Sequence, residues 1–247
     1  MKWHSRRKML TSAFHFRILE DFLDVMNNQC QTLISKLDKK VDCEEFNLYP
    51  YITHCALDII CETAMGKNIN AQDNNDTDYV KAVYRGSEIV FQRQRSPWFW
   101  YDWLFSLTPT GIEWKNAIKL MHKFTTDVIN ERKEYHKMIG NDDHEDEDIG
   151  IKKKFAFLDL LIKESKGGTV LTDDDIREEV DTFMFEGHDT TAANMAFTMY
   201  MMALYPGIQE QVQCELDQIF GESDREATSE DLSKMKYMEA CLKESLR

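Results

Sequence analysis

Apolar residues recur every three to four positions along most of the chain, which is the period of an α-helix. The pattern predicts one amphipathic helix over residues 2–40 and a strongly apolar helix over 48–65, which Gly66 ends. Further helices are predicted over 79–94, 113–138, 155–166, 206–220 and 229–247, the last with Ser229 as its N-cap. No strand ladder and no internal repeat interrupts them. The expected fold class is mainly α, in a single domain of residues 1–247.

The longest predicted helix covers residues 173–205, with Thr172 as its N-cap and three aspartates in its first turn. Its middle, FMFEGHDTTAANM, places polar groups inside an apolar run. Glu186 and Thr190 are four residues apart and share a face, and Asp189 sets an acid beside the Thr190 alcohol. Threonine hydroxyls can also bond back to helix carbonyls. An acid–alcohol pair of this kind suits proton delivery to a ligand, whereas the alternative is a buried helix with hydrogen-bonded polar side chains.

An aromatic cluster occupies the segment SPWFWYDWLFSLTPTG, residues 96–111. Its members are Trp98, Trp100, Tyr101 and Trp103. Such a cluster is interpreted as a packed corner, with a membrane-surface or substrate-entry element as the alternative.

The net charge of −14 argues against a nucleic-acid partner, because phosphate binding requires clustered Lys and Arg. Much of the acidity is local, since six of the eight residues 141–148 are acidic. That run predicts a solvated acidic loop over about 139–153. The chain contains no apolar run near the roughly 20 residues that a membrane helix needs.

The cysteine and histidine patterns give no metal motif. The six cysteines form no CxxC pair and are interpreted as reduced structural thiols; they are Cys30, Cys43, Cys55, Cys61, Cys214 and Cys241. A ferritin-like metal bundle needs ExxH motifs on facing helices, and no histidine has a glutamate three residues before it. That alternative is therefore weak.

Three motifs in order carry a resemblance to a known family. The hexapeptide EGHDTT, residues 186–191, resembles the oxygen-binding helix of the cytochrome P450 superfamily, in the form of family four. This is the fatty-acid ω-hydroxylase branch, to which many insect microsomal enzymes also belong. Trp3-xxx-Arg7 resembles the WxxxR helix, and Glu244-xx-Arg247 resembles the ExxR helix. The resemblance covers nearly the whole chain and implies the helical part of the cytochrome P450 fold, without its β-rich regions and haem-cysteine loop.

The resemblance implies haem as cofactor and assigns roles to the residues that match. Trp3 and Arg7 would seat a haem propionate, and Gly187 would leave room for iron-bound oxygen. Asp189 and Thr190 would relay protons to that oxygen.

Two further carboxylates take roles from the same resemblance. Glu186 is a candidate for an ester bond to a haem methyl group, with a merely hydrogen-bonded carboxylate as the alternative. Glu244 and Arg247 would form a structural pair rather than a reactive one, because burying an ion pair is costly unless both groups are fully hydrogen-bonded. A surface ion pair is the alternative.

The reaction implied is monooxygenation, in which one atom of O2 enters a C–H bond of a lipophilic substrate such as a fatty acid or a xenobiotic. Electrons would come from NADPH through a cytochrome reductase, at the cytosolic face of the endoplasmic reticulum, with a membrane anchor outside these residues. None of the six cysteines has the Phe, Gly and Arg neighbours of the axial thiolate ligand. We therefore expect a fragment of the enzyme, with weak or no haem binding and no turnover alone; the alternative is a non-catalytic helical remnant or interaction protein.

Overall fold

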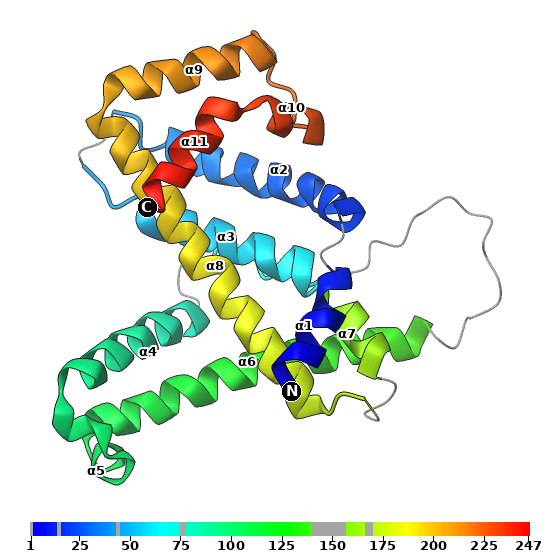
Figure 1. Ribbon diagram of the computed structural model, residues 1–247, viewed down its shortest axis with the longest axis vertical. Coiled ribbons are helices and arrows are strands. Elements are labelled where there is room, and N and C mark those ends of the chain that lie inside the picture. Colours follow the sequence, from blue (N-terminus) through cyan, green and yellow to red (C-terminus); the bar gives the residue numbers. More distant parts are fainter. Residues whose placement is uncertain (1, 14–15, 43–44, 75–77, 140–156, 166–169) are drawn as a thin grey trace.

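The chain forms a stack of helices around one long central helix, as the computed structural model in Figure 1 shows. The structure describes residues 2–13, 16–42, 45–74, 78–139, 157–165 and 170–247. Within these ranges there are eleven α-helices and one short 3-10 helix, and no strand. The predicted mainly α fold class is confirmed.

The helix bounds follow the sequence prediction closely in the second half of the chain, except that the single helix predicted over residues 229–247 is wrong, because Met235 separates two helices there. The elements are α1 (Lys2–Ala13), α2 (Phe16–Asp38), α3 (Tyr49–Ala64), α4 (Asp78–Arg95), η1 (Pro97–Trp100), α5 (Asp102–Ser106), α6 (Pro109–Ile139), α7 (Phe157–Ser165), α8 (Asp173–Leu204), α9 (Pro206–Phe220), α10 (Ser229–Lys234) and α11 (Lys236–Ser245).

The prediction of one continuous helix over residues 2–40 is wrong. The structure has α1 and α2 there, and the two helices lie against different parts of the molecule (Figure 1). α1 lies beside the N-terminal half of α8, whereas α2 packs along α3. Two packing partners in different directions cannot be reached by one straight helix, although the hydrophobic period is shared by both segments.

The central helix α8 begins where the sequence indicates. The Thr172 hydroxyl accepts a hydrogen bond from the Asp175 backbone N–H at 3.2 Å, and the Asp175 carboxylate accepts one from the Thr172 N–H at 3.0 Å. This reciprocal capping box satisfies backbone groups that a helix start leaves open. The same box starts α10, where the cap is Thr228 with Asp231 rather than the predicted Ser229, because only Thr228 has an acid three residues later.

α3 supplies much of the core that holds α8 in place. Leu57, Cys61 and Met65 are fully buried, and they share one apolar cluster with Ile176, Val180 and Met184 of α8. Gly66 ends this part of the chain with a φ of 67°, a conformation that glycine adopts without strain.

A buried ion pair joins α6 to α7 at the edge of this core. Arg132 binds Asp159 through two hydrogen bonds of 2.5 and 2.7 Å, and the His136 Nε2 lies 2.7 Å from the same carboxylate. The Asp159 side chain is only 2% exposed, so the charge is neutralised inside the fold.

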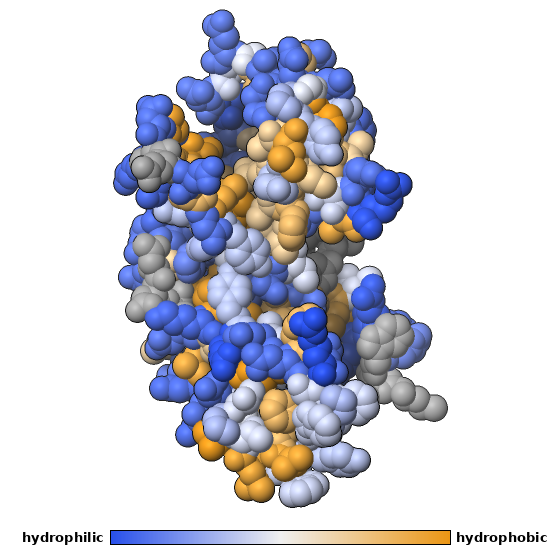
Figure 2. Space-filling model, turned by 90° about the vertical axis from the view of Figure 1, so that its left-hand side faces the viewer, coloured by the Kyte–Doolittle hydropathy of each residue, from blue (hydrophilic) through white to orange (hydrophobic). Residues whose placement is uncertain are grey.

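The aromatic cluster is exposed, so its interpretation as a packed corner is wrong. Trp98, Trp100, Tyr101 and Trp103 are 71%, 64%, 65% and 67% exposed. Phe105 fills the corner instead and is 3% exposed, with the Arg93 guanidinium over its ring. Pale and orange residues gather at the lower end of the molecule in Figure 2, the end at which Figure 1 shows α5.

Two sequence predictions fall partly outside the described ranges. Of the predicted acidic loop over residues 139–153, only Ile139, the last residue of α6, lies within the described ranges. Among the cysteines, Cys43 lies outside them. The other five thiols are free: Cys55 and Cys61 are buried, Cys241 is half-buried, and Cys30 and Cys214 are exposed. Among the described helices, none has the length and apolarity to cross a membrane.

Candidate functional site

One face of α8 carries an exposed polar strip in the middle of the molecule. Thr182, Glu186 and Thr190 follow each other at four-residue spacing and are all exposed, while His188 and Ala192 on another face are fully buried. The helix therefore separates a packed side from an open side. The open side carries the predicted oxygen-helix residues Glu186 and Thr190.

The threonine hydroxyls of this strip bond back to the helix. Thr190 Oγ1 donates to the Glu186 carbonyl at 2.6 Å, Thr182 Oγ1 donates to the Glu178 carbonyl at 2.8 Å, and Thr191 Oγ1 donates to the Gly187 carbonyl. The predicted back-bonding is confirmed. The Thr190 hydroxyl hydrogen is engaged, and its oxygen lone pairs remain available to accept a proton or a hydrogen bond.

Asp189 leaves α8 in a different direction from Thr190 and reaches α3. It is half-buried, and its Oδ1 accepts a hydrogen bond of 3.2 Å from the Tyr49 hydroxyl. Burial, followed by the nearby Asp189 charge, raises the pKa of Tyr49 to about 12. The structure thus joins the predicted acid to a tyrosine that the sequence pattern alone does not reveal.

Gly187 faces the neighbouring helix α3. A Cβ built there would lie 2.8 Å from Ile60 Cγ1 and 2.9 Å from Ile60 Cδ1. Such distances are well inside van der Waals contact, so the close approach of α3 and α8 accounts for the glycine.

His188 is a buried titratable group next to the predicted site. Its Nδ1 donates to the Met184 carbonyl at 2.5 Å, which leaves Nε2 as the unprotonated acceptor; Nε2 has no partner among the described residues. Burial lowers the pKa of His188, so the ring is neutral at pH 7. Its Nδ1 bond fixes the ring along the helix.

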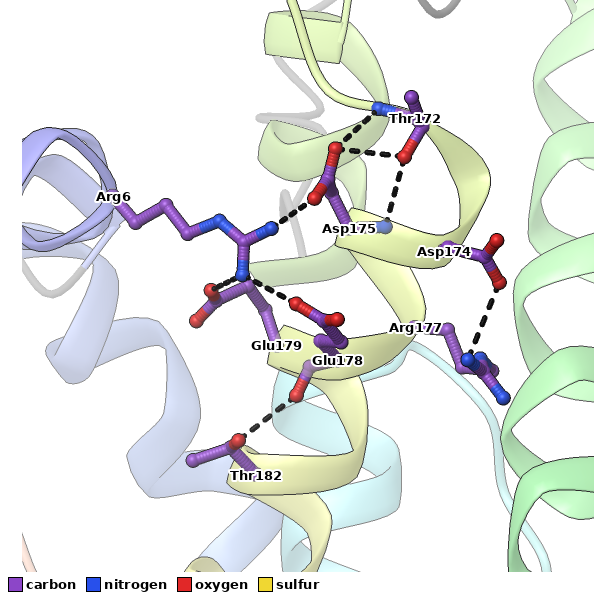
Figure 3. A network of polar contacts seen from close by, with 8 residues as sticks. All are labelled: Arg6, Thr172, Asp174, Asp175, Arg177, Glu178, Glu179 and Thr182. Carbon is purple, nitrogen blue, oxygen red and sulfur yellow. Dashed lines mark hydrogen bonds and ion pairs between the residues drawn. The ribbon is translucent and has the colours of Figure 1, made fainter. Parts of the chain in front are cut away.

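Arg6 ties α1 to the first turns of α8 (Figure 3). Its guanidinium binds Asp175 and donates to Glu178 at 2.8 Å and Glu179 at 2.9 Å. The Arg6 side chain is only 14% exposed. The sequence pattern singled out Arg7 and missed Arg6, although three acids on one face of α8 were a visible signal.

Arg7 differs from Arg6 in having no charged partner. It is exposed, and within the described ranges its side chain makes no ion pair, while its backbone carbonyl accepts from Thr11 Oγ1 at 2.8 Å. Trp3 lies in α1, but its side chain is outside the described part of the structure. An exposed guanidinium on a docked helix is suited to bind an anionic group such as a carboxylate.

The ExxR residues lie at the surface of this chain. Arg247 Nη2 is 2.7 Å from Glu244 Oε1, with side chains 81% and 64% exposed. The pair forms as an exposed contact at the end of α11. Beside it, α8, α9 and α11 line an apolar hollow of about 450 Å³ that includes Met202, Tyr205 and Tyr237.

A mostly apolar pocket lies between α4, α6 and α8. It has a volume of about 530 Å³ and is lined by residues that include Val83, Gly86, Val90, Trp114, Ile118 and Phe185. Its polar groups include Ser87, whose Oγ is buried without a partner among the described residues, and His122 and Asp181 at 3.6 Å from each other. Phe185 is the residue before Glu186, so the pocket adjoins the polar strip of α8.

The exposed groups at this site fit a haem. Within the described ranges there is no group of three His, Cys, Asp or Glu side chains that could hold a metal ion. Arg7, which has no ion-pair partner in the described part of the chain, offers a cation for a propionate, and the open face of α8 offers Glu186 and Thr190.

The sequence profile of the cytochrome P450 family matches residues 1–247. The chain is 52% identical to human cytochrome P450 4V2 over 251 residues, covering 100% of this chain and 47% of that protein. It is 50% identical to Drosophila melanogaster cytochrome P450 4c3 and 43% identical to Blattella germanica cytochrome P450 4c21, covering all of this chain and 48% and 49% of theirs.

The chain therefore belongs to the cytochrome P450 family, and its relatives are family-four members. It spans about half the length of the curated relatives it matches.

Proposed function

We propose that this chain is the oxygen-helix half of a monooxygenase that inserts one atom of O2 into a lipophilic substrate. The observation that carries the proposal is the open face of α8. There Glu186 and Thr190 are exposed, and Asp189 beside them is held by Tyr49.

Haem, when bound, supplies the binding and activation of O2. Arg7 and Trp3 of α1 would hold a propionate, and Arg6 fixes α1 on α8. Glu186 lies on the open face and would be the residue to form an ester with a haem methyl group, a step in which a peroxide would take two electrons and one proton would be released from that methyl.

Proton delivery falls to Asp189 and Thr190. The Thr190 hydroxyl is oriented by its bond to the Glu186 carbonyl and accepts a hydrogen bond through its lone pairs. Asp189 supplies protons to the Thr190 hydroxyl from the packed side of the helix. Such general acid–base groups contribute roughly 10²–10⁴-fold to a reaction.

The pocket between α4, α6 and α8 receives the substrate. Its apolar lining favours an alkyl chain or a ring system, because burial of apolar surface is worth roughly 25 cal/mol per Å². NADPH electrons arrive through a reductase partner at the endoplasmic reticulum membrane.

A chimera tests the proposal, with this chain replacing the matching half of the human relative. With reductase, NADPH, a fatty acid and ¹⁸O2, the chimera is expected to yield a product that contains one ¹⁸O atom. Thr190→Ala should lower product formation by about tenfold or more at equal haem content. Thr182→Ala is the matched control, because Thr182 has the same back-bond two turns away.

Absence of labelled product from a haem-loaded chimera would refute the enzyme proposal and favour a non-catalytic helical role. The ester has its own readout. Haem should resist acid–organic extraction from the chimera and be released from the Glu186→Ala variant.

A further inference from the structure

Asp189 is held on the packed side of α8 by a residue of α3. Tyr49 of α3 donates its phenolic hydrogen to Asp189 Oδ1 at 3.2 Å. The other carboxylate oxygen has no hydrogen-bond partner among the described residues. The one bond therefore fixes the carboxylate without consuming it.

Tyr49 is itself fixed by its neighbours. Tyr84 of α4 donates to Thr53 Oγ1 at 2.9 Å, and Thr53 Oγ1 donates to the Tyr49 carbonyl at 2.9 Å. The two tyrosine rings lie with their centroids 6.1 Å apart. Thr53 is fully buried, so this arrangement is built into the core between α3 and α4.

Electrostatics couples the same groups. The charged or titratable groups that act on Tyr49 are Asp189 and Tyr84, and both raise the pKa of its phenol after the larger effect of burial. The Asp189 charge also contributes to the raised pKa of Tyr84, behind burial. Tyr49 therefore stays protonated and acts as a hydrogen-bond donor at every physiological pH.

We propose that Tyr49 is a positioning residue for Asp189: it fixes the carboxylate on the packed side of α8, one residue before Thr190, from where the carboxylate supplies protons to the open face. Tyr84 and Thr53 support Tyr49 in turn. This inference rests on the proposed monooxygenase function, and it adds α3 and α4 to the proton-delivery apparatus. Tyr49 itself keeps its proton and transfers none.

The first arm of the test needs no haem and uses the 247-residue chain. The Tyr49 phenol is titrated by ¹³Cζ NMR of tyrosine-labelled protein, with the resonance assigned by its loss in Tyr49→Phe. The Tyr49 pKa should lie near 12 in the wild type and be lower in Asp189→Asn, although it should stay above its usual value because burial, the larger cause, persists. An unchanged Tyr49 pKa in Asp189→Asn would overturn the proposal.

The second arm uses the haem-loaded, reductase-supplied chimera. Tyr49→Phe should lower the fraction of NADPH electrons that reach product by roughly tenfold, since a hydrogen bond to a charged group is worth about that factor. The solvent deuterium isotope effect on turnover should rise, and KM should stay unchanged. Tyr51→Phe is the matched control, because Tyr51 lies on the same helix and contacts Phe46 instead.

The two arms separate the inference from the proposed function. A wild type that turns over, with Tyr49→Phe equal to it in coupling and isotope effect, would refute the positioning role alone. A wild type without turnover would refute the monooxygenase proposal, and the NMR titration would still decide whether Tyr49 holds Asp189.

Discussion

Replacing Gly187 by alanine tests whether this glycine serves helix packing or ligand space. Because the added Cβ would lie 2.8 Å from Ile60 Cγ1, α3 and α8 must shift apart or Ile60 must change rotamer. Overpacking of this kind costs roughly 1–3 kcal/mol. Alanine also gains about 1 kcal/mol over glycine as a helix former. The net expectation is a free energy of unfolding lower by roughly 0–2 kcal/mol.

A second variant makes the reasoning sharper. In an Ile60→Ala background the two atoms that collide are gone, so Gly187→Ala should then stabilise the chain by about 1 kcal/mol. The coupling between the two changes is therefore roughly 1–3 kcal/mol. Gly207→Ala is the control, because no atom lies within 4 Å of its added Cβ.

Urea denaturation followed by circular dichroism measures these free energies, provided that the m-value stays constant. A stabilisation of about 1 kcal/mol by Gly187→Ala in both backgrounds would refute the packing account. The glycine would then have no packing role, and the ligand-space interpretation would remain.

Three further predictions follow from the described contacts. Arg6→Ala should lower the free energy of unfolding by about 1–3 kcal/mol because its bonds to α8 are lost, whereas Arg7→Ala should change it by no more than about 0.5 kcal/mol. Urea denaturation measures both, and equal losses would show that Arg6 does not anchor α1 on α8. Burial lowers the pKa of His188, so the unfolded chain binds a proton that the folded chain does not, and the free energy of unfolding falls as the pH drops below about 6.5. His188→Leu should make the free energy of unfolding less dependent on pH between 7 and 5. Thermal melts at the two pH values measure this, and an unchanged dependence would contradict the role of His188. Asp159→Asn should cost about 3–5 kcal/mol, because it leaves the partly buried Arg132 uncompensated, and a loss below about 1 kcal/mol would show the pair to be dispensable.

The helical fold follows from sequence to a large extent because its signals are local. The Thr172–Asp175 capping box, Pro206 and Gly66 each act within a few residues, so the bounds of α8, α9 and α3 can be predicted. The division between α1 and α2 depends instead on tertiary partners. The hydrophobic period is the same whether a helix packs on α8 or on α3.

The candidate site likewise has features that local sequence predicts and features that depend on tertiary contacts. The Glu186–Thr190 face and the threonine back-bonds follow from helical spacing, and the structure bears both out. Tyr49 lies 140 residues from Asp189 in sequence, and nothing local to either residue indicates their contact. The exposure of the tryptophans depends on which aromatic fills the corner, and Phe105 does so because it faces Arg93.

The reduced carbon monoxide difference spectrum tests the central claim most directly. The chimera that carries this chain in place of the human relative's matching half should bind haem and show a thiolate-type band, with circular dichroism confirming a helical fold. The 247-residue chain alone should show no such band, because none of its six cysteines has the surroundings of an axial ligand. A folded chimera without the band would contradict the assignment of the open α8 face to haem. A thiolate-type band from the chain alone would show that one of its own cysteines reaches the iron.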